Sequence, residues 1–288
     1  MKSTYYECHG HIMMDGEDYL QARSRHKNGV NIVRVREEFK KLQSAGVGYF
    51  RDGGDALGVS EYARQIAAEY EIEYATPLFA IHRKGYYGGI VGHAYTDMEE
   101  YKTLVKKVRD GRGDFIKIMV SGIITFREYG ELSCPHLPEE EIRTLIHIAH
   151  DAGYPVMIHI NGDEALRAAI RAGADSIEHG AFMEEETIEM LAESETIWVP
   201  TAAAIAAFTN RTDFDSAVAK ETLERHLADI HTAYEKGAII APGSDSGAAG
   251  VPHGEGTLTE YRLLAQAGMK PESIEQAAKA LRMRFSGK

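Results

Sequence analysis

The sequence predicts an α/β protein of the (β/α)8 barrel type, or TIM barrel, formed by a single domain over residues 1–288. Short apolar runs alternate with longer amphipathic segments along the chain, as they do where parallel strands are joined by helices. Three of the amphipathic segments end in Ala-Gly, at Gly46, Gly153 and Gly173. A glycine at that place permits the left-handed end of a helix, so the chain is divided into repeated helix–strand units.

The order of these units predicts eight strands. They are expected at residues 4–9, 47–51, 75–81, 115–120, 155–160, 175–179, 196–200 and 238–243. Helical patterns lie between them, at residues 31–45, 60–70, 97–109, 138–152, 163–172, 184–193 and 215–236. Pro138 and the three glutamates that follow it suit the first turn of a helix. An open doubly wound sheet is the alternative, but it would need a glycine-rich phosphate loop after the first strand, and HGHIMMDG is not one.

The composition is that of a globular protein that does not bind nucleic acid. Hydrophobic residues make up 44% of the chain and charged residues 26%, and the formal net charge of −12 opposes phosphate binding. No apolar run approaches the ~20 residues that span a membrane, and the start MKSTYYECHGH has no apolar signal core. Two cysteines, Cys8 and Cys134, do not make a disulfide framework, so a cytoplasmic location is expected.

Six residues with metal-site chemistry stand at the ends of expected strands. They are His9, His11, Lys117, His159, His179 and Asp245. The carboxyl ends of barrel strands meet at one mouth, so we expect these side chains to converge there. In HGH, the two histidines face the same side of a strand. Imidazole and oxygen ligands suit Zn²⁺, and also Mn²⁺, Co²⁺ or Fe²⁺, so two divalent ions are the expected cofactors.

Lys117 lies inside the apolar run FIKIMV, where a lysine is rarely buried without a partner. It could form a structural ion pair or extend toward solvent, and a desolvated lysine could also act as a Schiff-base nucleophile. A third interpretation is carbamylation by carbon dioxide, which turns the amine into an anionic bridge between two metals. We favour this third interpretation, because a cationic or iminium lysine would not explain four imidazoles.

Asp245 lies in PGSDSG after the last expected strand, where an aspartate often caps its own turn. Placed opposite the histidines, it can ligate one metal and also carry protons. A hydroxide that bridges the two metals would attack a polarised carbonyl, and Asp245 would take the proton of the water and pass it to the leaving group. Asp245 and Lys117 are therefore the expected catalytic residues.

Together these residues resemble the signature of the amidohydrolase superfamily. HGH is similar to its strand-one HxH, Lys117 to the carbamylated lysine of strand four, His159 and His179 to the ligands of strands five and six, and Asp245 to the aspartate of strand eight. GYFRDGG, FIKIMVSG and GSDSGAAGVPHGEG resemble the imidazolonepropionase-like and prolidase-like branch, and the similarity extends over residues 5–280. The resemblance implies a binuclear metal centre.

The resemblance also implies roles for the ligands: His9, His11 and Asp245 for the more buried metal, His159 and His179 for the more exposed one, and Lys117 as the bridge.

The sequence departs from the branch in three places. The small β-sandwich usual in relatives is expected to be absent, Asn161 stands where relatives often have a second histidine, and Ser121-Gly122-Ile123 stands in place of Ser-Gly-Gly. These departures indicate a substrate that differs from those of known relatives.

The loop after the third expected strand, IHRKGYYGGIVGHAYTD, lies where barrel loops often contact substrate. Arg83 could bind a substrate carboxylate through paired hydrogen bonds, and Gly92-His93 resembles a Gly-His of the prolidase-like branch. Tyr129, in the loop after Lys117, is a weaker candidate. Arg83, His93 and Tyr129 are the expected substrate contacts, although each is equally compatible with a mobile surface loop.

The expected function is hydrolysis of an amide, cyclic amide or lactone bond in a small substrate, with a dipeptidase that acts on a dipeptide or an N-acyl amino acid as the specific hypothesis. The alternatives are a mononuclear deaminase, a Schiff-base aldolase and a catalytically silent metal-binding barrel. A small molecule is the expected partner, with neither nucleic acid nor membrane. Association of outer helices into a homo-oligomer stays open.

Overall fold

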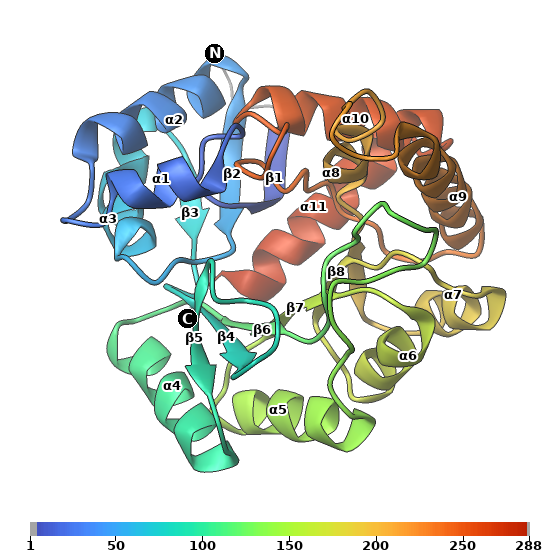
Figure 1. Ribbon diagram of the computed structural model, residues 1–288, viewed down its shortest axis with the longest axis horizontal. Coiled ribbons are helices and arrows are strands. Elements are labelled where there is room, and N and C mark those ends of the chain that lie inside the picture. Colours follow the sequence, from blue (N-terminus) through green and yellow to red (C-terminus); the bar gives the residue numbers. More distant parts are fainter. Residues whose placement is uncertain (1–4, 287–288) are drawn as a thin grey trace.

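The computed structural model describes residues 5–286, and Figure 1 shows strands in the interior with helices arranged around them. The nine strands of these residues all belong to two parallel sheets. Thr4, where the first expected strand begins, lies outside the described residues. The first sheet has the order β1 (Tyr5–Gly10), β2 (Val47–Asp52) and β3 (Glu73–Ala75). The second has the order β5 (Gly92–Tyr95), β4 (Ala80–Arg83), β6 (Ile116–Met119), β7 (Val156–Ile160), β8 (Ser176–His179) and β9 (Ile197–Val199).

The single strand expected at residues 75–81 is divided into β3 and β4. Pro77 has no N–H to donate to a neighbouring strand, and Leu78 takes a positive φ of 69°. The break does not separate the two sheets. The backbone N–H of Asp114, just before β6, donates to the carbonyl of Thr76 at 2.9 Å, and the Thr76 N–H donates to the Asp114 carboxylate at 2.8 Å. The segment therefore pairs with β2 at its start and with β6 at its end.

The eighth expected strand, at residues 238–243, forms only isolated bridges. The Trp198 N–H in β9 donates to the Ile239 carbonyl at 2.9 Å, and the Cys8 N–H in β1 donates to the Pro242 carbonyl at 2.9 Å. A side chain at Gly243 would come within 2.7 Å of the His9 backbone nitrogen, so only glycine fits between β9 and β1. The segment thus lies between the two sheets, and the strands and outer helices make a TIM-barrel-like α/β fold.

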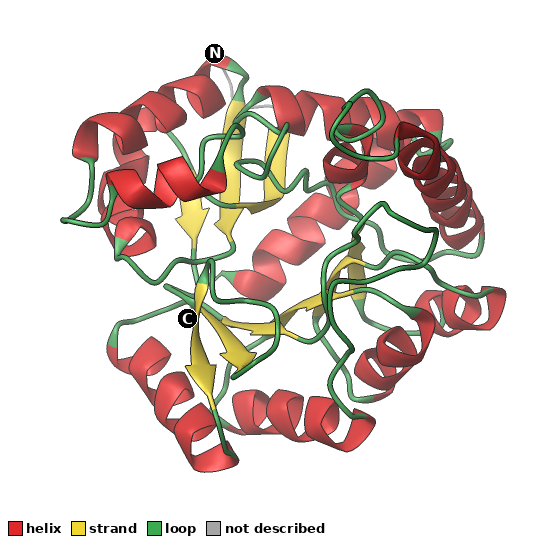
Figure 2. Cartoon of the chain, in the orientation of Figure 1, coloured by secondary structure: helices red, strands yellow, loops and turns green. Residues whose placement is uncertain are grey.

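Most helices lie around the outside of the strands (Figure 2), whereas α11 (Pro271–Phe285) crosses the centre of the view. Each of the seven expected helical segments contains a helix: α2 (Ile32–Ser44), α3 (Val59–Ile66) with the 3-10 turn η1 (Ala67–Tyr70), α4 (Met98–Asp110), α5 (Glu139–Asp151), α6 (Asp163–Arg171), α7 (Glu185–Ala192) and α9 (Ser216–Glu235). Four further helices were not predicted: α1 (Tyr19–Arg25), α8 (Ala202–Ala206), α10 (Glu255–Gln266) and α11 (Pro271–Phe285). Within residues 5–286, no helix is both long and apolar enough to cross a bilayer.

Strand residues point alternately to the outer helices and to the inside of the arrangement. On β6, Ile116 and Ile118 join the apolar core with the outer helices, and Lys117 points the other way. The inward positions close to the carboxyl ends of the strands are polar, and they hold the histidines. The fold thus brings the polar strand ends of distant segments to one place.

Candidate metal centre

The structure brings all four predicted histidines together. The ring centroids of His159 and His179 are 4.5 Å apart, those of His9 and His179 are 5.0 Å apart, and those of His9 and His11 are 5.5 Å apart. His9, His11 and His159 are buried, and His179 is half-buried. Four imidazoles from β1, the residue after it, β7 and β8 therefore form one cluster.

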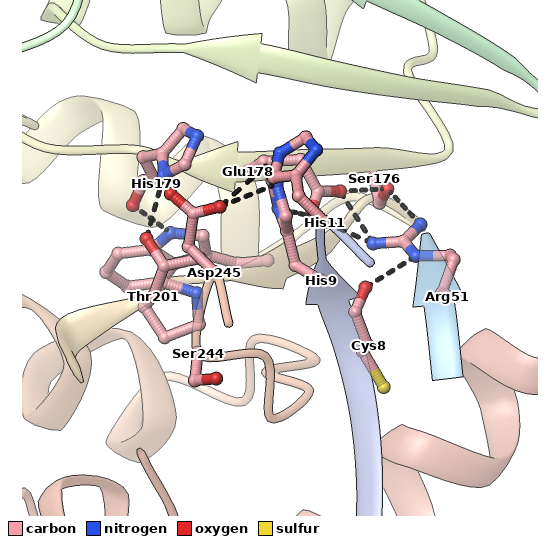
Figure 3. A network of polar contacts seen from close by, with 12 residues as sticks. Cys8, His9, His11, Arg51, Ser176, Glu178, His179, Thr201, Ser244 and Asp245 are labelled. Carbon is pink, nitrogen blue, oxygen red and sulfur yellow. Dashed lines mark hydrogen bonds and ion pairs between the residues drawn. The ribbon is translucent and has the colours of Figure 1, made fainter. Parts of the chain in front are cut away.

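Asp245 joins this cluster between His179 and the pair His9 and His11 (Figure 3). Its Oδ1 lies 3.4 Å from Nε2 of His11 and 3.6 Å from Nε2 of His9. The Asp245 backbone takes a positive φ of 60°, and its N–H donates to the His9 carbonyl at 2.8 Å. This backbone bond places the carboxylate. His9, His11 and Asp245 have ligand atoms close enough to hold one metal ion.

Three of the imidazoles are oriented by a contact on one ring nitrogen. Nδ1 of His9 donates to Glu178 at 2.7 Å, Nε2 of His159 lies 3.3 Å from the Gly122 carbonyl, and Nδ1 of His179 lies 2.8 Å from Oγ1 of Thr201. Each contact leaves the other ring nitrogen available. Metal-binding histidines are commonly held in this way, because the outer contact fixes the tautomer and the ring orientation.

Glu178 connects His9 to a buried arginine. Its carboxylate accepts hydrogen bonds from Nη2 of Arg51 at 2.8 and 2.9 Å and from Oγ of Ser176 at 2.5 Å. Nε of Arg51 donates to the Cys8 carbonyl at 2.6 Å (Figure 3). Arg51 and Glu178 are both fully buried, so each neutralises a charge that would be costly alone. The sequence analysis missed this pair, although both residues are charged positions inside predicted strands.

Thr201 is held in turn by a helix end. It takes a positive φ of 50° directly before α8. The buried carboxylate of Glu260, on α10, accepts the backbone N–H groups of Ala202 at 3.2 Å and Ala203 at 2.7 Å. A carboxylate is favourable at a helix N-terminus. The residue that contacts His179 is therefore positioned by α10.

Lys117 is 1% exposed and lies on the interior face of β6. Its Nζ has no hydrogen-bond partner among the described residues. Burial lowers the pKa of Lys117 to about 8, and the nearby Glu178 carboxylate opposes the decrease. A neutral amine is thus far more accessible here than for a lysine in water.

Burial also keeps the imidazoles neutral. It lowers the pKa of His11 and of His159 to about 3 and the pKa values of His9 and His179 well below the usual range, and the Lys117 charge adds to each decrease. For Asp245, burial raises the pKa to about 6 while Lys117 opposes the increase. Neutral imidazole is the form that binds metals.

The donor set fits divalent metal ions. Four imidazoles converge, and Oδ1 of Asp245 and Nζ of Lys117 are buried without a hydrogen-bond partner in residues 5–286. Buried polar atoms without partners are rare and usually indicate a missing ligand. A side chain at Gly53 would overlap the His11 ring, so this position leaves space for the imidazole.

The comparisons with known proteins agree with this geometry. The sequence profile of the amidohydrolase family matches residues 8–283. The chain belongs to the amidohydrolase family. Ochratoxinase from Aspergillus niger is 29% identical over 206 residues, which are 69% of this chain and 41% of the relative. An uncharacterised protein of Mycobacterium tuberculosis is 27% identical over 203 residues, which are 68% of this chain and 53% of that protein. The match therefore spans only about half of these curated relatives or less.

Solved structures share the fold of this amidohydrolase. The structure of A. niger ochratoxinase has a TM-score of 0.80 at 22% identity and covers 99% of this chain and 72% of that chain. A Xaa-Pro dipeptidase with bound methionine has a TM-score of 0.75 at 24% identity and covers 99% of this chain and 77% of that one. These likenesses support the TIM-barrel-like arrangement of the strands.

The three expected substrate residues of the amidohydrolase contact side chains outside the imidazole cluster. Nη1 of Arg83 donates to Glu141 on α5 at 2.7 Å. His93 is exposed, and its ring centroid lies 4.6 Å from that of Phe79. Tyr129 is 37% exposed and contacts Phe182 and the guanidinium of Arg225. In contrast Tyr87, which was not singled out, lies with its ring centroid 5.0 Å from that of His159.

The Arg51–Glu178 pair of the amidohydrolase can be tested with Glu178→Gln. We expect this change to lower the free energy of unfolding by about 3–5 kcal/mol, because the Arg51 charge stays buried without its carboxylate. Metal affinity should fall about 10–100-fold, because His9 loses the acceptor that orients it. Urea denaturation and metal titration measure the two effects.

Glu189→Gln is the matched control. Glu189 forms an exposed ion pair with Lys236 at 2.8 Å, and its removal should leave both measurements unchanged. If Glu178→Gln and Glu189→Gln have the same free energy of unfolding and the same metal affinity, the role of Glu178 is contradicted.

Proposed function

We propose that this amidohydrolase is a metal-dependent hydrolase that cleaves an amide bond in a small substrate, with a dipeptide or an N-acyl amino acid as the substrate class. The observation that carries the proposal is the convergence of four neutral imidazoles on Asp245 and Lys117, both of which have a buried polar atom without a hydrogen-bond partner within residues 5–286. Two such atoms beside four imidazoles indicate a missing ligand.

The proposed cofactors are two divalent ions, with zinc as the first choice. His9, His11 and Asp245 would hold one ion, and His159 and His179 would hold the other, with Lys117 between them. When bound, such ions lower the pKa of a coordinated water and polarise a carbonyl group. Burial of the ligands keeps competing water away from them.

Asp245 is the proposed proton carrier. Burial already raises its pKa to about 6, so its carboxylate accepts and returns a proton near neutral pH. In the proposed sequence, Oδ1 takes the proton of the attacking water. The same oxygen then gives the proton to the leaving nitrogen as the C–N bond breaks, which returns the carboxylate to its starting state.

Lys117 is proposed to react with carbon dioxide. The lone pair of the neutral Nζ attacks the carbon atom, an N–C bond forms, and one N–H proton leaves to give an anionic carbamate. The absence of a hydrogen-bond partner for Nζ in residues 5–286 and its low pKa both support this step. The carbamate would add two oxygen atoms beside Nζ, which has no hydrogen-bond partner within residues 5–286.

The names of similar proteins support an amide substrate. Ochratoxinase and a Xaa-Pro dipeptidase share the fold. A one-metal, deaminase-like function is the second candidate. It is favoured by one observation, that His9, His11 and Asp245 form a compact three-ligand group without the other two histidines.

Metal content separates these candidates. Elemental analysis of protein purified without chelator is expected to find about two divalent ions per chain, whereas about one would favour the mononuclear candidate.

Lys117→Ala should lose metal and activity, and short carboxylates such as formate or acetate should partly restore both by replacing the bridge. Two bound metals and full activity in Lys117→Ala would disprove the bridging role.

Asp245→Asn is expected to fold normally, because asparagine also tolerates the positive φ of this position. Turnover should fall about 10²–10⁴-fold, because an amide cannot carry the proton. Steady-state kinetics on an N-acyl amino acid at matched metal content measures the loss. Asp151→Asn, at an exposed position at the end of α5, is the control. Unchanged turnover in Asp245→Asn would exclude Asp245 as the proton carrier.

The pKa of Lys117 predicts how activation depends on pH. Carbamylation needs the neutral amine, so at a fixed concentration of dissolved carbon dioxide the rate at which metal-free protein regains activity with zinc should rise as the pH rises through about 8. Below that pH the ammonium form predominates and does not react. Stopped-time activity assays after mixing measure this rate. A midpoint near that of free lysine, above pH 10, would contradict the desolvated amine.

A further inference from the structure

A cavity of about 720 Å³ lies outside the cluster of metal ligands. One wall is the segment after β6, which folds back on itself through an antiparallel bridge between Ile124 and Leu132. The other wall is residues 212–215, between α8 and α9. The volume is in the range of small-molecule pockets.

The first wall continues directly from a residue that contacts a histidine. Ile123 lines the cavity and follows Gly122, whose carbonyl lies 3.3 Å from Nε2 of His159. The second wall follows α8, whose first turn comes after Thr201, and Oγ1 of Thr201 lies 2.8 Å from Nδ1 of His179. The cavity therefore begins at the residue that follows the contact with His159.

Aromatic rings hold the two walls together. The ring of Phe126 stacks on that of Phe208 with centroids 4.7 Å apart, and Phe208 contacts Phe214 edge to face at 4.8 Å. The Arg211 guanidinium lies 5.2 Å from the centroids of both Phe208 and Phe214. Ile123 is 41% exposed and Phe214 is 38% exposed, so two large apolar side chains of the lining stay uncovered.

The charged groups of the lining already have partners. Asp215 accepts the backbone N–H of Ala217 at 2.9 Å at the start of α9, Asp213 pairs with Arg211 at 2.6 Å, and Arg127 pairs with Glu131 at 2.9 Å. The uncharged lining consists of the apolar side chains of Ile123, Ile124, Phe126 and Phe214 and the hydroxyl groups of Thr125, Ser133 and Thr212.

We propose that this cavity binds an apolar arm of the substrate, an aromatic or branched aliphatic group joined by a short linker to the amide that is cleaved. This inference rests on the proposed hydrolase function and narrows it to amides that carry a bulky apolar group. Ile123 and Phe214 are the specificity-determining residues, and they act on binding of the arm.

Two carboxylates that differ only in the arm test the proposal: 4-phenylbutanoate and butanoate, titrated by calorimetry into the zinc-loaded protein. We expect the Kd of 4-phenylbutanoate to be lower by roughly tenfold or more, since a few buried carbons give at least this factor. Phe214→Ala and Ile123→Ala should each remove most of this difference, measured as the ratio of the two Kd values, and leave the Kd of butanoate unchanged. Met283→Ala, at a 74% exposed position on α11, should change neither Kd.

Equal Kd values for the two probes, or a ratio that survives both substitutions, would overturn the proposal. A parallel assay with N-(4-phenylbutanoyl)glycine and N-butanoylglycine separates it from the proposed function. If the zinc-loaded protein cleaves neither amide but the binding ratio holds, the hydrolase function is wrong and the apolar site stands. If it cleaves both equally well and binds both probes equally, the apolar site is wrong and the hydrolase function stands.

Discussion

The buried carboxylate of Glu178 is the interaction on which the rest of the centre depends. It accepts hydrogen bonds from Arg51 on β2, from Ser176 on β8 and from His9 on β1. One charged group thus connects strands from both sheets. Because the pair is fully desolvated, loss of either partner leaves a charge that the interior cannot accommodate. The Glu178 carboxylate therefore both orients His9 and joins the two sheets.

The sequence alone predicted which side chains converge, because chemistry and topology coincide in this fold. Imidazoles, an amine and a carboxylate at the ends of apolar runs can be found by inspection, and parallel strands bring such ends together. All four histidines and Asp245 meet accordingly. Amphipathic periodicity likewise located α2 to α7 and α9, whose apolar faces are long enough to recognise.

What the sequence did not predict depends on tertiary contacts. The division of residues 75–81 follows from the positive φ of Leu78 beside Pro77, which no periodicity reveals. The short helix α8 depends on the distant Glu260 at its N-terminus. Arg83, the last residue of β4, donates to Glu141 on α5, a partner that only the folded chain brings near.

The position of Asp245 in the chain has a consequence for how the protein is made. The four imidazoles and Lys117 all precede residue 180, whereas Asp245 and the segment that bridges β9 to β1 come later. Chains fold progressively from the N-terminus as they leave the ribosome. A nascent chain therefore presents histidines before it has the carboxylate that completes the three-ligand group. Stable capture of the proposed metal at this group would therefore be a late event in biosynthesis, and a loaded centre would mark a chain that has joined its two sheets.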